Sequence, residues 1–143
     1  MATYGYGQNK GKREVYTKEE MDAKLTSWKY PQFKNLNVTS GKEQSVTFNI
    51  KAQVTDWNYD LYKVTMCLGE ANMLTVKEIY VLAGDNEAGN GRVNIAKQSL
   101  ITDTDYIGTI TATNNNNNTV TITFTPTEAG KLKIKIEPSA IWL

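Results

Sequence analysis

The feature that most constrains the fold is a strict alternation of apolar and polar residues in the middle of the chain. Val46, Phe48, Ile50, Ala52 and Val54 are apolar, and every residue between them is polar. Successive side chains of an extended strand point to opposite faces, whereas a helix needs apolar residues three or four positions apart. The alternation therefore predicts a strand over residues 46–54 with one buried face.

Similar alternation recurs along the chain and predicts about seven short strands. The apolar positions of the other runs are Leu36 and Val38; Tyr62, Val64, Met66 and Leu68; Val93 and Ile95; Tyr106, Gly108, Ile110 and Ala112; Val120, Ile122 and Phe124; and Leu132, Ile134 and Ile136. The stretches 84–91 and 114–118 are loops by composition, and the five asparagines of 114–118 suggest a long, mobile hairpin loop. Short strands at this spacing favour an antiparallel β-sandwich.

The region 70–101 is less regular. Leu74 and Val76 have one parity and Ile79 and Val81 the other, which predicts a bulge or a break between the two pairs. A short helix over residues 70–80 is the alternative.

The N-terminal segment has a different pattern. Residues 1–13 are polar and glycine-rich, so they form either a disordered tail or an arm that orders on a partner. Thr17 and Glu20 form a capping box, after which Met21, Leu25 and Trp28 make one apolar stripe of a short helix that ends before Pro31. A helix of about ten residues is not stable alone, so it must pack on its own domain or on another chain. We therefore expect an arm and anchor helix at 1–30 and a sandwich domain at 33–143. The candidate partner-binding residues are Tyr4, Tyr6, Lys10, Lys12, Arg13, Tyr16, Met21, Leu25 and Trp28.

Composition argues against catalysis and metal binding. The chain has no histidine and a single cysteine, Cys67, which removes the usual general base and the usual zinc ligands. The acidic runs at 85–87 and 103–105 lack the spacing of a calcium loop. We expect no catalytic residues, no metal and no cofactor.

Charge and hydropathy limit the partners. The formal net charge of +1 and the lack of stacking aromatics beside the basic residues predict no nucleic-acid binding. No apolar run is long enough for a membrane span or a signal peptide, so we expect no membrane contact and assembly in the cytoplasm.

The segment TVTITFTPTEAGKLKIKIEP resembles the end of an immunoglobulin-like domain of the bacterial and filamin type. Thr125, Pro126, Glu128, Ala129 and Gly130 match the corner that joins its last strands; Pro126 would end strand pairing and Gly130 would supply the φ values of the corner. The resemblance implies an immunoglobulin-like antiparallel β-sandwich with one more strand after the corner hairpin. Only residues 137–143 remain for that strand, with Ile141 and Leu143 on one face. We therefore expect the N-terminal segment or a neighbouring subunit to cover part of this edge.

The segment VYTKEEMDAKL resembles an element near the start of many phage fibre and capsid-associated proteins, on the match of Tyr16, Thr17, Lys18, Glu20, Met21 and Asp22. The resemblance implies a structural protein of a bacteriophage virion, of the capsid-decoration or head-fibre type, bound to the major capsid protein or other virion subunits as an oligomer or on a lattice. The alternative is an immunoglobulin-like module that binds carbohydrate or a host surface through Trp57, Tyr59 and Asn116.

Overall fold

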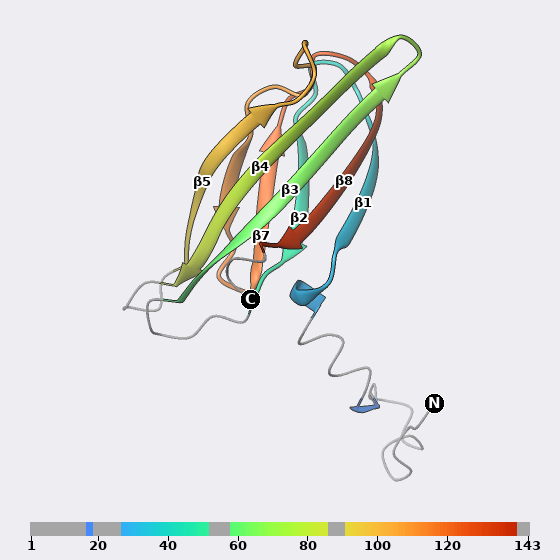
Figure 1. Cartoon of the computed structure of the whole chain (residues 1–143). Helices are drawn as coiled ribbons and strands as arrows, with labels where there is room; N and C mark the ends of the chain where they lie inside the picture. Colours follow the sequence, from blue (N-terminus) through green and yellow to red (C-terminus); the bar gives the residue numbers. More distant parts are fainter. Residues whose placement is uncertain (1–16, 19–26, 52–57, 86–90, 140–143) are drawn as a thin grey trace.

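The structure is a computed structural model that describes residues 17–18, 27–51, 58–85 and 91–139. It is mostly β, as predicted, with two antiparallel sheets and a single turn of 3-10 helix (Figure 1). The five-stranded sheet has the order β1-β8-β3-β4-β5 and the three-stranded sheet the order β2-β7-β6. The elements are η1 (Ser27–Lys29), β1 (Gln32–Val38), β2 (Gln44–Asn49), β3 (Asn58–Glu70), β4 (Met73–Asp85), β5 (Gly91–Leu100), β6 (Thr111–Asn114), β7 (Thr119–Phe124) and β8 (Gly130–Pro138).

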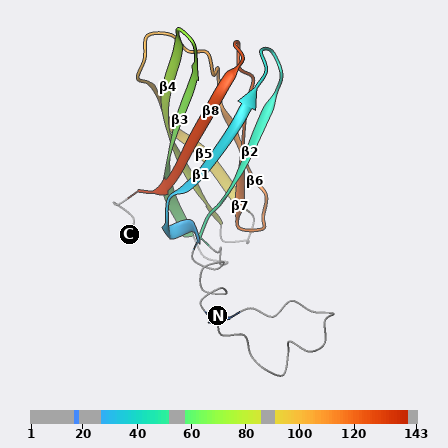
Figure 2. The same ribbon diagram turned by 90° about the vertical axis from the view of Figure 1, so that its right-hand side faces the viewer.

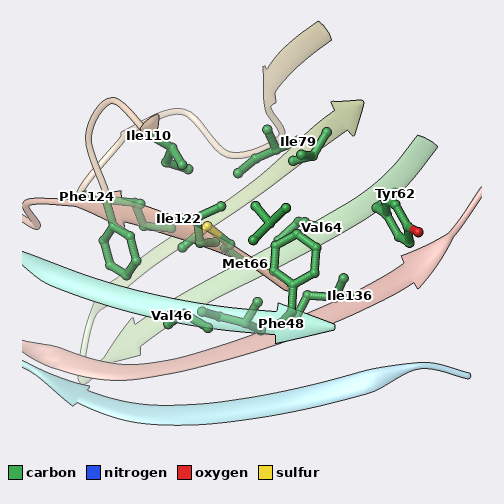
Figure 3. Packing of buried hydrophobic residues seen from close by; sticks show 14 of the residues in the cluster. Val46, Phe48, Tyr62, Val64, Met66, Ile79, Ile110, Ile122, Phe124 and Ile136 are labelled. Carbon is green, nitrogen blue, oxygen red and sulfur yellow. The ribbon is translucent and has the colours of Figure 1, made fainter. Parts of the chain in front are cut away.

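The core lies between the two sheets and consists of the apolar positions of the alternating runs (Figure 3). Val120 and Ile122 of β7 face Val64 and Met66 of β3 across it, and all four are fully buried. Burial of this apolar surface is the main force that holds the sheets together. The predicted strand 46–54 is confirmed as far as Asn49; Ile50 is buried but lies beyond the end of β2, and Ala52 and Val54 lie outside the described residues.

Strand β8 is not at the edge of its sheet. It pairs with β3 on one side and with β1 on the other, so that Leu36 lies opposite Leu132. The strand that covers this edge therefore comes from the same chain and from its N-terminal side. Ile141 and Leu143, the residues expected to form a further strand, lie outside the described residues.

Strand β4 is continuous and pairs with β3 without a shift from Met73 to Asp85, so the predicted bulge or break between Val76 and Ile79 and the alternative helix at 70–80 are both wrong. The apolar residues change from one face of the strand to the other because Thr75 and Lys77, which share a face with Ile79, point into the protein. Both polar residues are buried beneath the loop between β5 and β6. The irregularity in this region is a register shift between β4 and β5 at Tyr80 and Val81.

The predicted strand through Tyr106, Gly108, Ile110 and Ala112 is wrong for most of its length. Residues 101–110 form a loop, and only Thr111–Asn114 pair as β6. Ile107 and Ile110 are nevertheless buried. The loop therefore covers one end of the core as a strand would.

The asparagine run is not a long loop. Residues 115–118 close a compact hairpin between β6 and β7, in which Asn116 and Asn118 adopt positive φ values of 61° and 65°. Asparagine tolerates this left-handed conformation better than most residues. The prediction of a long, mobile loop at 114–118 did not take account of the positive φ values that asparagine can adopt.

The corner between β7 and β8 joins the two sheets, as the resemblance implied. Gly130, however, has no positive φ. A β-carbon at Gly130 would lie 2.9 Å from the carbonyl oxygen of Gly69. Glycine is therefore required here by the close approach of two strands and not by the turn conformation.

The predicted helix falls mostly on residues outside the described part of the chain. Residues 1–16 and 19–26 are not described. At Trp28, where the helix was expected to end, the structure has the 3-10 turn η1 instead. The described part of the chain contains no α-helical element, and of the predicted helix only Lys18 has helical backbone there, so the helix is not supported.

The ends of the strands gather at two poles of the molecule (Figures 1 and 2). The proximal pole holds η1, the end of β8 and the β6–β7 hairpin. The distal pole, opposite to it, holds the β3–β4 hairpin, the loop 101–110 and the corner 125–129. The described chain enters at Ser27 and leaves at Ser139, both at the proximal pole.

Candidate functional site

The proximal pole collects the predicted site residues that the structure describes: Trp28, Tyr59 and Asn116. The predicted residues Tyr4, Tyr6, Lys10, Lys12, Arg13, Tyr16, Met21, Leu25 and Trp57 lie outside the described part of the chain.

Trp28 is half-buried and packs against the core of its own domain. The ammonium groups of Lys29 and Lys51 each lie 5.6 Å from the centroid of its ring, within the range of a cation–π interaction. The predicted stripe of Met21, Leu25 and Trp28 therefore has at least one member that holds the chain to the sandwich.

Two polar groups of β3 interact with Lys51. The main-chain amide of Lys51 donates a 2.7 Å hydrogen bond to the hydroxyl oxygen of Tyr62, and burial raises the pKa of that phenol. Asp60 points inward on the same face of β3, and burial raises the pKa of its carboxyl group, opposed by the positive charge of Lys51. This arrangement ties the end of β2 to β3 at the proximal pole.

The hairpin asparagines bind the edge of the other sheet. The side-chain oxygen of Asn116 accepts a 2.8 Å hydrogen bond from the amide of Gly91, and the side-chain amide of Asn114 donates to the carbonyl oxygens of Gly84 and Arg92 at 3.3 and 3.1 Å. Because its side-chain oxygen is used within the domain, Asn116 is a structural residue of the pole. Asn116 is also exposed, and its role as a surface-ligand residue stays a prediction.

At the distal pole, a partly buried ion pair fixes the loop 101–110. Lys77 is 5% exposed and donates to a carboxylate oxygen of Asp105 at 2.6 Å and to the carbonyl oxygen of Gly108 at 2.5 Å. The other carboxylate oxygen accepts from the amides of Ile107 and Gly108. Burial would raise the pKa of Asp105, but these hydrogen bonds and the charge of Lys77 together lower it.

Thr75 provides a second attachment for the same loop. Its hydroxyl donates a 2.8 Å hydrogen bond to the carbonyl oxygen of Thr104 and accepts one of 2.9 Å from the amide of Tyr106. Two shallow depressions of about 410 and 340 Å³ adjoin the loop and share Asn72 and Tyr106 in their linings. The distal pole is thus a firmly held surface that is open to solvent.

Neither pole shows the arrangement of a metal centre. Within the described residues, no group of three or more carboxylates and thiols is placed to hold a metal ion. The described helical turn is far too short to cross a membrane, and no other described helix could do so.

Comparison with solved structures gives a structural likeness to a phage protein. The chain is similar to part of the tailspike protein of Acinetobacter phage vB_ApiP_P1, with a TM-score of 0.46 and 11% identity over 75% of this chain. It spans about a fifth of the tailspike, 21% of that chain. A likeness of this extent assigns neither fold family nor function. No protein-family model matches the sequence, and no curated protein matches it significantly.

Sequence reasoning missed the Lys77–Asp105 pair. A signal was present, because Lys77 continues the inward alternation of Ile79, Val81 and Ala83. A lysine at an inward position needs a buried counter-charge, but its partner is 28 residues away in the sequence. No local pattern identified Asp105 as that partner.

Proposed function

We propose that the protein is a non-enzymatic structural component of a bacteriophage virion, attached through residues 1–30 and displaying its sandwich outward. The observation that carries the proposal is the position of η1. Trp28 holds the chain at the proximal pole, so residues before Ser27 join the domain at the end opposite to the β3–β4 hairpin. An anchor at this end leaves the distal pole free.

The strand order supports an immunoglobulin-like type of sandwich. In variable-type immunoglobulin domains one sheet contains strands B, E and D, and the other contains G, F, C, C′ and C″. Here β2-β7-β6 and β8-β3-β4-β5 follow the same orders. The departure is β1, which occupies the place of the last strand beside β8. A display domain closed in this way needs no strand from a neighbour.

The resemblance of residues 16–22 to phage fibre and capsid-associated proteins supports the choice of a virion. The expected partners are the major capsid protein or other virion subunits, and the bound form is an oligomer or a lattice. Weak individual contacts are enough for stable attachment, because binding at one site raises the effective concentration of the protein at the neighbouring sites.

The test is removal of residues 1–26. This truncation keeps Trp28, so the sandwich retains its contact with η1 and should keep a cooperative thermal transition. We expect the truncated protein to be absent from virions purified on a density gradient, whereas the full chain co-purifies with them.

A matched control changes the other pole. The substitution Glu70→Gln alters an exposed residue at the β3–β4 hairpin and should leave incorporation at the level of the unaltered chain. Normal incorporation of the truncated protein would contradict the proposal, as would the absence of the full chain from purified particles.

A further inference from the structure

The outer face of β1 and β8 combines basic, amide and aromatic side chains in a regular order. Three cross-strand pairs follow one another along the ladder: Phe33 with Lys135, Asn35 with Lys133, and Asn37 with Lys131. Side chains of one face recur every second residue, so successive lysines stand about 6.8 Å apart along the strand. The two strands lie side by side in Figure 2.

The two pairs nearer the distal pole are free of internal partners. In the described part of the chain, no hydrogen bond or ion pair involves the side chains of Asn35, Asn37, Lys131 or Lys133, and all four residues are exposed. Lys135, by contrast, lies 3.6 Å from Glu137. The positive charge of this face is therefore concentrated at Lys131 and Lys133.

A shallow depression lies between these pairs. It has a volume of about 280 Å³ and is lined by Asn35, Leu36, Asn37, Lys131, Leu132 and Lys133. Leu132 is buried in the core, and Leu36 lies opposite it. These two residues therefore contribute main-chain atoms to the floor, while the amides and ammonium groups form the rim. Phe33, which is 67% exposed, continues the row towards the proximal pole.

We propose that this face binds an acidic polysaccharide lengthwise along β1 and β8. Lys131 and Lys133 form charge-assisted hydrogen bonds with carboxylates of the chain. The carboxamides of Asn35 and Asn37 offer both donors and acceptors to sugar hydroxyls. The exposed ring of Phe33 covers the apolar side of a sugar ring.

The chemistry of the face favours a sugar polymer over a single-stranded nucleic acid. Sequence-tolerant binding of single strands depends on several aromatic rings on which successive bases stack, and this ladder presents only Phe33 among the described residues. Alternating amides beside lysines suit a ligand in which hydroxyls and carboxylates alternate. The proposed binding surface differs from the one predicted from the sequence. That surface included Asn116, whose side-chain oxygen is bonded within the domain, whereas the face proposed here lies on β1 and β8.

The experiment measures binding of the full chain to immobilised polygalacturonate by biolayer interferometry, with dextran as the neutral polymer and oligothymidylate as the nucleic acid. We expect binding to polygalacturonate that weakens with salt, and no binding to dextran. The double variant Lys131→Gln/Lys133→Gln should bind about tenfold more weakly or worse. Phe33→Ala and Asn35→Ala should each weaken binding to polygalacturonate.

The control variant is Lys42→Gln/Lys97→Gln, which removes the same charge from two exposed lysines elsewhere. It should bind like the unaltered chain, and thermal transitions should show that all variants fold. The proposal is overturned if the unaltered chain does not bind polygalacturonate, or if both double variants lose affinity equally. Equal binding to oligothymidylate with no effect of Phe33→Ala or Asn35→Ala would also overturn it, because charge alone would then explain retention. These outcomes are independent of residues 1–26, so either proposal can fail without the other.

Discussion

Among single residues, Lys77 has the environment that matters most to stability. A buried ammonium group is costly unless it is paired, and removal of its partner leaves that cost uncompensated. Asp105 supplies the pairing, and its side chain is 31% exposed. Solvent therefore screens part of the interaction, and its contribution is smaller than that of a fully buried pair.

The substitution Asp105→Asn tests this pair through pH. The folded state holds the pKa of Asp105 below its ordinary value of 3.8, so the carboxylate stabilises the fold above that pH, and this contribution is lost as pH falls through the folded pKa. We expect Asp105→Asn to lower the free energy of unfolding at pH 7 by about 1–2 kcal/mol. Urea denaturation should show a smaller difference in stability between the unaltered chain and the variant at pH 3 than at pH 7. A difference that is the same at both pH values would argue against an ionic role.

Asp60 behaves in the opposite sense. Its raised pKa means that the folded state prefers the protonated form, so this residue destabilises the fold at neutral pH and ceases to do so in acid. The opposite effects of Asp60 and Asp105 on the free energy of unfolding therefore partly cancel when stability is measured as a function of pH. Only the substitution of one at a time separates them.

At the scale of elements, three side chains hold the sheets together at their edges, one on one side and two on the other. On one side Gln32 of β1 acts as a short piece of strand against β2: its amide nitrogen donates to the carbonyl oxygen of Asn49 at 2.8 Å, and its oxygen accepts from the amide of Asn49 at 2.9 Å. On the other side Asn114 and Asn116 of the β6–β7 hairpin reach β4 and β5.

The substitution Gln32→Ala should weaken the first edge. We expect a loss of about 1 kcal/mol in the free energy of unfolding, with a local increase in hydrogen exchange at the amide of Asn49, whose acceptor is removed. Asn37→Ala on the same strand is the control, because Asn37 points outward and makes no hydrogen bond within the described residues. Unchanged exchange at Asn49 would show that water replaces the glutamine at no cost.

The substitution Gly91→Ala should weaken the second edge. A β-carbon at Gly91 would lie 2.7 Å from Cγ of Asn114 and would also meet the side-chain oxygen of Asn116. We expect a loss of about 1–3 kcal/mol from this overpacking, measured by thermal denaturation. Gly69→Ala is the matched control, since the nearest atoms to its β-carbon would be 4.0 Å away. Equal stability of the two variants would mean that the hairpin shifts without cost.

The sequence correctly predicted those strands in which the apolar side chains face the core and the polar side chains face water. The runs at 62–68, 120–124 and 132–136 alternate because one face meets the core and the other meets water, and each is a strand. The prediction failed at Thr75 and Lys77, where polar residues face inward and the compensation comes from a distant loop. It failed at Asn116 because a composition typical of loose loops here provides specific hydrogen bonds.

At the scale of the whole molecule, the packing of Trp28 bears on where the arm ends and the domain begins, which the sequence predicted to be between residues 30 and 33. The sandwich is complete among its own strands, but η1 covers part of the core from the proximal pole. We therefore predict that residues 27–30 contribute to the stability of the folded unit, although the sequence analysis grouped them with the anchor.

A comparison of residues 27–143 with residues 31–143 tests this boundary. Loss of the half-buried Trp28 and its neighbours should lower the free energy of unfolding by about 1–2 kcal/mol, measured by urea denaturation. Trp28→Ala in the longer protein should reproduce most of the effect. Identical denaturation midpoints for the two lengths would place the boundary after η1.

The pairing of β1 with β8 also has a consequence for synthesis on the ribosome. The first strand of the sheet is made early, but β8, the strand with which it pairs among the described residues, follows about 90 residues later, which at roughly 5–20 residues per second is a delay of about 5–20 s. During that interval Phe33 and both edges of β1 are exposed in the nascent chain. Newly made copies on neighbouring ribosomes could pair through these strands, so the timing of β8 decides whether each chain closes on itself.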